Sequence, residues 1–128
     1  SEGTSIGIDA GLVVKWIIES AALNDQEITE LTRLISKIVI ETVGEQKARN
    51  VFVKTSTGFY KPEDGSTGGA TIDAVSLMSQ NAGPLKVKAS GGIYSREDLE
   101  KMVDAGASRI GTSAGLEIIR GEKANTDY

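Results

Sequence analysis

Residues 85–110, LKVKASGGIYSREDLEKMVDAGASRI, hold a complete strand, helix and strand pattern. The apolar start of this stretch is typical of a short strand that breaks at a pair of glycines. Ser95 then offers a helix N-cap with Asp98 at the third helical position, and Gly106 ends the helix. Residues 107–110 follow as a second short strand. A strand, a helix and a strand at this spacing predict parallel pairing through a right-handed crossover.

The same pattern extends through the rest of the chain. The other expected elements are a strand at 12–18 (LVVKWII), a helix from Asn24, with Glu27 completing a capping box, to about Gly44, a strand beginning at 51–53, a helix at 71–81 and a last helix at 113–120 that Gly121 stops. The order β-α-β-α-β-α-β-α fits both an eight-stranded (β/α)8 TIM-type barrel and an open doubly wound sheet. Because a barrel usually takes about 250 residues, this α/β chain is expected to hold about four β/α units, half a barrel. We expect one half-barrel domain at 1–121 and a flexible tail at 122–128.

The composition excludes several classes of function. The 128 residues contain no cysteine and no histidine, so disulfides, thiolate metal sites and imidazole as general base or metal ligand are excluded. A net charge of −4 argues against nucleic-acid binding. The apolar runs are too short to span a membrane, and the first residues lack a signal-peptide pattern. We therefore expect a soluble, cytoplasmic protein that binds neither nucleic acid nor membrane.

Two lysines occur at the carboxyl ends of expected strands. Lys54 closes the run VFVK, and Lys88 closes LKVK. Side chains alternate along a strand, so Lys54 should point away from the helices, which in a barrel means into the interior where catalytic groups gather. Burial and mutual repulsion each lower a lysine pKa, so one of the two amines would become nucleophilic and could form a Schiff base with a carbonyl. The alternative is two solvated lysines at strand ends.

Glycines follow the last two strands. Gly91 and Gly92 come after the third strand, and Gly111 precedes Ser113 at the start of the last helix. Glycine lets backbone N–H groups approach an anion closely, and the loops after the last two strands of a barrel often bind phosphate. A phosphorylated substrate would fit this pattern. The alternative is that these glycines only form tight turns.

Four motifs together resemble the 2-deoxyribose-5-phosphate aldolase family. They are KTSTGF at 54–59, GGAT at 68–71, VKASGGI at 87–93 and RIGTSAG at 109–115, and KWIIE at 15–19 is also similar to the family. The resemblance runs from about residue 12 to 121, in the family's order and spacing, and matches the carboxyl-terminal half. It implies a cofactor-free class I aldolase with a TIM barrel that interconverts 2-deoxy-D-ribose 5-phosphate with glyceraldehyde 3-phosphate and acetaldehyde.

The resemblance also implies roles for particular residues. Lys54 would form the Schiff base and Lys88 would activate it, while Thr57 would contact polar groups of the substrate. The phosphate would be held mainly by backbone N–H groups of Gly58, Gly91, Gly92 and Ser113. Tyr128 would assist proton transfer from the tail, or simply end it. Lys15 and Glu19 would form a charge network beneath the site, or a structural ion pair.

One expected catalytic group is absent from these motifs. The family's proton-relay aspartate lies in the amino-terminal half, and neither Asp9 nor Asp25 occupies a corresponding motif. Four unclosed strands would also leave two edges and an inner face uncovered, so we expect a homo-oligomer or a complementary amino-terminal half chain. Three interpretations follow: half of a deoxyribose-phosphate aldolase, a non-catalytic half-barrel phosphate-binding module that needs a partner, or another Schiff-base enzyme of phosphorylated sugars.

Overall fold

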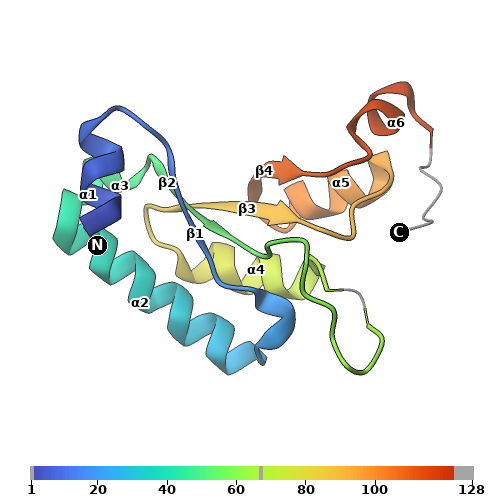
Figure 1. Cartoon of the computed structure of the whole chain (residues 1–128), viewed down its shortest axis with the longest axis horizontal. Coiled ribbons are helices and arrows are strands. Elements are labelled where there is room, and N and C mark those ends of the chain that lie inside the picture. The colour runs from blue at the N-terminus through green and yellow to red at the C-terminus, as the bar shows by residue number, and fades with distance from the viewer. Residues whose placement is uncertain (1, 67, 123–128) are drawn as a thin grey trace.

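Four parallel strands form one sheet in the order β1-β2-β3-β4 (Figure 1). The computed structural model describes residues 2–66 and 68–122. The strands are β1 (Val14–Ile17), β2 (Val51–Lys54), β3 (Lys86–Ser90) and β4 (Ala107–Gly111). The helices are α1 (Glu2–Asp9), α2 (Asp25–Val43), α3 (Glu45–Ala48), α4 (Ile72–Asn81), α5 (Arg96–Asp104) and α6 (Gly115–Arg120), with a short 3-10 turn η1 (Ser20–Ala22). Sequential strand order is that of a barrel wall, whereas a doubly wound sheet reverses direction. The α/β half-barrel prediction is therefore confirmed.

Local capping signals set the helix boundaries. Asn24 accepts a hydrogen bond from the backbone N–H of Glu27, and the Glu27 carboxylate accepts one from the Asn24 N–H, at 2.9 and 2.8 Å. Gly44 follows as the C-cap of α2. Thr71 caps α4 by accepting a 3.1 Å hydrogen bond from the Ala74 N–H. These contacts satisfy backbone donors that a helix start leaves free, which explains why α2 and α4 begin where the sequence predicts.

The hydrophobic core lies between the sheet and its covering helices. Val51 and Val53 of β2 are fully buried, as are Val39 of α2 and Val75 and Met78 of α4. Helices α2 and α4 pack against each other below the sheet in the view of Figure 1. The alternate residues of each strand therefore divide into a buried set that faces the helices and a second set that faces away from them.

The opposite face of the sheet is open. Among residues 2–66 and 68–122, no helix packs across it, and Ile17, the last residue of the edge strand β1, is 47% exposed. Strands β3 and β4 point to the right of Figure 1, the side where the loop around residues 58–66 and α6 lie, while α1 lies on the left beside the amino end of β1. The open face thus corresponds to the inner wall of a half barrel.

The structure departs from the sequence predictions in several places. Lys88 was expected to close its strand, but β3 continues to Ser90 because Ala89 and Ser90 still pair with β4, so Lys88 lies in the middle of the strand. Helices α1 and α3 were not expected, and α6 starts at Gly115 rather than at residue 113. Helix α1 contains two glycines that weaken helix propensity, and it is held by tertiary contacts. The Trp16 indole donates a 3.0 Å hydrogen bond to Thr4, and Gly7 lies so close to Val14 that a Cβ would come within 2.6 Å of its methyl group. No helix in the described ranges is long and apolar enough to cross a bilayer.

Candidate active site

Lys54 and Lys88 lie side by side on the open face. The two residues are register partners on neighbouring strands β2 and β3, and Lys88 is in turn the partner of Arg109 on β4. Neighbouring parallel strands are about 4.8 Å apart, so the side chains of register partners are adjacent. Lys54 and Lys88 are both half-buried. The pairing that alternation along the strands predicted is therefore present.

Five cations share this face, which we call the basic face. They are Lys15, Lys54, Lys86, Lys88 and Arg109. Phe52 lies among them and is only 5% exposed, because the Lys86 ammonium and the Arg109 guanidinium sit 5.9 and 4.6 Å from its ring centre. Both distances suit cation–π attraction. Lys86, Arg109 and Phe52 were not proposed as site residues, although the alternation of cations at 86 and 88 was a signal for this face.

The pKa of Lys88 is lowered from its ordinary value. Desolvation by burial is the largest cause, followed by repulsion from Lys54, Lys15 and Arg109. Gly111 gives the lysine room, because a Cβ there would approach the Lys88 Cε to 2.9 Å. A lowered pKa increases the fraction of neutral amine, so Lys88 is suited to accept a proton from a neighbouring group.

The residues after Lys54 attach β2 to β3. Thr55 and Ser56 are fully buried, and both hydroxyls donate to the Ser90 carbonyl, at 3.1 and 2.8 Å. The Thr55 hydroxyl also accepts a 3.0 Å hydrogen bond from the Ser90 N–H. Two of the polar residues in the KTSTGF motif therefore have structural roles, and they hold the carboxyl ends of the two lysine-bearing strands together.

Thr57 binds Glu19 across the mouth of the site. The Glu19 Oε2 accepts from the backbone N–H of Thr57 at 3.0 Å and from the Thr57 hydroxyl at 2.5 Å. No ion pair joins Glu19 to Lys15, which is exposed, within the described part of the chain. The structural ion pair considered for these two residues is therefore not formed, and Glu19 instead contacts a residue predicted to bind substrate.

The glycine loops approach one another closely. Gly58, Gly91 and Gly92 have φ of 89°, 83° and 74°, in the left-handed region. Gly91 also packs against the backbone of Gly69: a Cβ at Gly91 would lie 2.8 Å from the Gly69 Cα. The GGAT and VKASGGI motifs therefore meet in space, and at least part of the glycine content is required by this contact.

A further contact joins the loops after β3 and β4. The Thr112 hydroxyl donates a 2.6 Å hydrogen bond to the Ile93 carbonyl and accepts one of 2.9 Å from the Ala114 N–H. This contact joins the residue after Gly92 to the residue before Ser113, which is exposed, and the phosphate-binding role of these residues stays a prediction. No described contact ties Gly58 to these loops, and Tyr128 lies outside the described residues.

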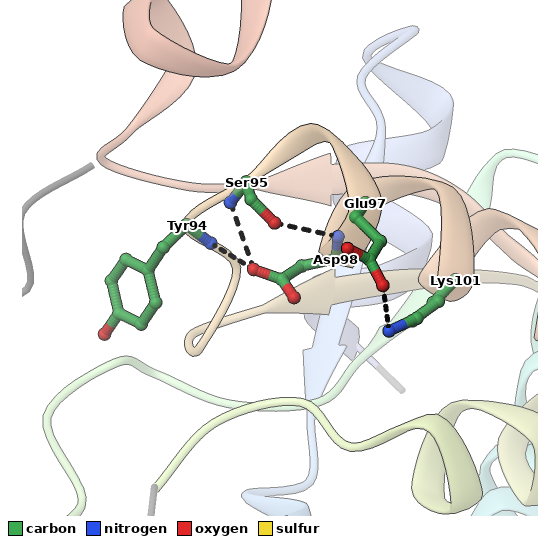
Figure 2. A network of polar contacts seen from close by, with 5 residues as sticks. All are labelled: Tyr94, Ser95, Glu97, Asp98 and Lys101. Carbon is green, nitrogen blue, oxygen red and sulfur yellow. Dashed lines mark hydrogen bonds and ion pairs between the residues drawn. The ribbon is translucent and has the colours of Figure 1, made fainter. Parts of the chain in front are cut away.

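The loop after β3 is fixed at its far end by the start of α5 (Figure 2). The Asp98 carboxylate accepts from the N–H groups of Tyr94 and Ser95 at 3.2 and 3.0 Å, and the Ser95 hydroxyl accepts from the Asp98 N–H at 3.1 Å. These hydrogen bonds lower the pKa of Asp98, with the Ser95 contact as the largest cause. Lys101 pairs with Glu97 one turn further, at 2.7 Å. The predicted capping box is confirmed.

Two surface grooves lie away from the lysines. One of about 380 Å³ runs between α2 and α4 beside Arg33 and Asn81, and one of about 310 Å³ lies between α4 and α5 beside Ser76. Neither includes a residue of the basic face. An open sheet face has only one wall, so it forms no enclosed pocket even where its side chains are suited to chemistry. Within the described ranges, no group of three carboxylate side chains is arranged to hold a metal ion.

Comparisons with known proteins agree with this geometry. A curated deoxyribose-phosphate aldolase of Streptococcus sanguinis is 47% identical over 119 residues, which cover 92% of this chain and 47% of the relative. The solved structure of the aldolase QR15 superposes with a TM-score of 0.66 at 35% identity, covering 93% of this chain and 51% of that one. The deoxyribose phosphate aldolase of Aeropyrum pernix, described as a tetramer, gives 0.62 at 29% identity, covering 93% and 47%.

No family model matches the chain. The chain spans about half the length of the curated relatives that it matches, although it aligns over nearly all of its own residues. The sheet with its covering helices is correspondingly about half of the α/β barrel of its structural neighbours. The chain is therefore a relative of the deoxyribose-phosphate aldolases over about half of their length.

Proposed function

We propose that this chain provides the Schiff-base half of a deoxyribose-phosphate aldolase. The observation that carries the proposal is the register pairing of Lys54 and Lys88 on the basic face, next to the converging glycine loops. The resemblance of the surrounding motifs and the identity to named aldolases support the same reaction. The substrate would be 2-deoxy-D-ribose 5-phosphate in its open-chain aldehyde form.

In the proposed reaction, the neutral Lys54 amine attacks the C1 aldehyde and water leaves, giving a protonated imine. Lys88, the register partner of Lys54, would assist as the second amine of the site, and its lowered pKa increases the fraction of it that is neutral. The C2–C3 bond then breaks, its electron pair moves toward the imine to give an enamine on Lys54, and the C3 hydroxyl gives its proton to a base as C3 becomes the aldehyde of glyceraldehyde 3-phosphate, which leaves. Protonation at C2 and attack by water release acetaldehyde and restore Lys54. The family resemblance assigns the base to a carboxylate in the other half of the barrel.

The phosphate would bind where the glycine loops meet. Gly91, Gly92 and Ser113 lie in segments that the Thr112 contact draws together, and left-handed glycines present backbone N–H groups without a side chain in the way. Gly58, on the other side of Lys54, would complete the set. The basic face adds favourable charge for a dianionic group.

The open face would be covered by a complementary half rather than by a second copy. Two copies placed face to face would bring two sets of five cations together, and like charges across an interface cost several kcal/mol. A complementary half that carries carboxylates would neutralise them. A homo-oligomer would then form through other surfaces, as the reported tetramer of the Aeropyrum pernix aldolase illustrates for that protein.

A second function is favoured by the open face itself. Because the described residues form only one wall of a barrel and the relay aspartate is not among their motifs, these residues alone would act as a non-catalytic phosphate-binding module. The two functions differ in turnover, since the module binds phosphate compounds without cleaving them, even when a complementary half is bound.

The test is a turnover assay with and without a partner. The chain is co-expressed with the remaining half of the Streptococcus sanguinis aldolase, and release of glyceraldehyde 3-phosphate from deoxyribose 5-phosphate is followed by coupled NADH oxidation. We expect turnover from the pair, its loss in Lys54→Ala and its retention in Lys61→Ala, an exposed lysine outside the site. A pair that associates but gives no turnover would favour the binding module, and turnover retained in Lys54→Ala would exclude Lys54 as the nucleophile.

A further inference from the structure

The segment after β1 is tied to the segment after β2 at Glu19. The Ile18 N–H donates to the Lys54 carbonyl at 3.1 Å, and the Ser20 N–H donates to the Thr55 carbonyl at 2.7 Å. Glu19, between these two residues, extends its carboxylate to Thr57. The position of Thr57 relative to Lys54 therefore depends on Glu19 as well as on the strand that carries both.

Glu19 has a strained backbone. Its φ of 54° and ψ of 60° are left-handed, and within residues 2–66 and 68–122 it is the one non-glycine residue with positive φ. A residue with a Cβ is disfavoured in this region by about 1–2 kcal/mol. Such strain persists where neighbouring contacts enforce it, and it concentrates at functional sites.

The Glu19 carboxylate is also incompletely satisfied. Its Oε1 is buried and has no hydrogen-bond partner among the described residues, whereas Oε2 receives both donors of Thr57. A buried acceptor without a partner destabilises the fold. Backbone strain and a buried unpaired oxygen at the same residue point to a role for Glu19 other than stabilising the fold, and its carboxylate hydrogen-bonds to Thr57.

Glu19 fixes the direction of the hydrogen bonds that Thr57 can make. A threonine hydroxyl has one donor and two acceptor positions. The Thr57 hydroxyl gives its proton to Glu19 and accepts from the Phe59 N–H at 3.3 Å, so one acceptor position remains. Thr57 is exposed, and that position is available to a ligand. The ligand group there must donate, which a sugar hydroxyl can do and an ionised phosphate cannot.

We propose that Glu19 is a positioning residue that makes the Thr57 hydroxyl an acceptor for a hydroxyl group of the substrate. This inference rests on the proposed Schiff-base function at Lys54, and it specifies which part of the substrate Thr57 binds. Thr57 selects the hydroxylated carbon chain, while the phosphate binds at the glycine loops. Glu19 itself does not touch the substrate.

The test compares two aldehydes in one variant series. Acetaldehyde carries no hydroxyl and deoxyribose 5-phosphate carries two in its open-chain form, so the ratio of their trapping rates at Lys54 with cyanoborohydride reports the Thr57 contact. Glu19→Gln should lower trapping of the sugar phosphate about fivefold more than trapping of acetaldehyde, the size expected for one hydrogen bond. Thr57→Val should lower the ratio similarly, and Glu19→Gln with Thr57→Val should be no worse than Thr57→Val alone. Glu27→Gln, the same substitution in the α2 capping box, should leave the ratio unchanged.

Hydrogen exchange separates this inference from the proposed function. The Thr57 N–H donates to Glu19, so its exchange should become faster in Glu19→Ala and remain slow in Glu27→Gln. If the parent chain forms no adduct with either aldehyde, the Schiff-base proposal fails, while the exchange result still tests the Glu19 contact. Equal losses for both aldehydes in Glu19→Gln, or unchanged Thr57 exchange in Glu19→Ala, would overturn the positioning role.

Discussion

The contact between Gly91 and Gly69 predicts a large difference between substitutions at two adjacent glycines. Gly91 and Gly92 both have left-handed φ, at 83° and 74°. An alanine at either position would be destabilised by about 1–2 kcal/mol in that conformation. The two positions differ in the room available for a Cβ. A Cβ at Gly91 would lie 2.8 Å from the Gly69 Cα and 3.2 Å from the Ser56 Oγ, whereas a Cβ at Gly92 would lie at an ordinary 3.7 Å from the Ala70 carbonyl oxygen.

The expected losses follow from these two contributions. Overpacking against backbone adds about 1–3 kcal/mol, so Gly91→Ala should lower the free energy of unfolding by about 2–5 kcal/mol. Gly92→Ala should lose only the conformational part, about 1–2 kcal/mol. Gly69 does not have a left-handed φ, but an added Cβ there would lie 2.4 Å from the Gly91 carbonyl carbon. Gly69→Ala should therefore lower the free energy of unfolding by about 1–3 kcal/mol through overpacking alone.

Urea unfolding measures all three variants. The chain has a single tryptophan, Trp16, which is partly buried and hydrogen-bonded to Thr4, so its fluorescence reports loss of the fold. Equal destabilisation by Gly91→Ala and Gly92→Ala would refute the close approach of the two loops. A Gly69→Ala variant as stable as the parent chain would refute it independently.

Three further predictions concern stability. Hydrogen bonding lowers the pKa of Asp98 below its ordinary 3.8, so Asp98 of the unfolded chain is protonated first as the pH falls, and the capping contribution of about 1 kcal/mol should be lost below about pH 4. Asp98→Ala should lose this contribution already at neutral pH, and urea unfolding should show a smaller fall in its stability at acid pH. Burial and like charges lower the pKa of Lys88, so Lys88 loses its proton at a lower pH in the native chain than in the unfolded chain, and the free energy of unfolding should rise with pH toward 10.5. Lys88→Met should be more stable than the parent chain at pH 7 and should lack that rise. An unchanged pH profile in Lys88→Met would contradict this prediction. Thr71→Ala should cost about 1 kcal/mol through loss of the α4 cap, measured as a lower thermal midpoint, while Ser76→Ala on the same helix should cost less.

Local signals explain why much of the fold can be predicted from the sequence. The capping boxes at Asn24 and Ser95 satisfy helix donors within three residues, so the starts of α2 and α5 depend on neighbours in the chain. Alternation along a strand likewise places Lys54 and Lys88 on one face without knowledge of the tertiary structure. Helix α1 is different, because its stability depends on packing against Trp16 rather than on propensity.

The supporting contacts of the site are not readable from local sequence. Glu19 and Thr57 are 38 residues apart, and the left-handed backbone at Glu19 departs from what a glutamate normally adopts. The Gly91 contact with Gly69 depends on how two loops approach in three dimensions. The cation–π contacts at Phe52 require the register of three strands. Motif resemblance predicts the site residues, whereas the packing around them can be described only from the folded structure.

The most direct test of the central claim is the position of the covalent adduct. The chain is incubated with ¹³C-labelled acetaldehyde and cyanoborohydride, digested and mapped by mass spectrometry, with Lys61 as an internal exposed reference. The account predicts N-ethyl-lysine first at Lys54, with slower labelling there in Lys88→Met. Labelling that reaches Lys61 as fast as Lys54, or that leaves Lys54 unmodified, would contradict it.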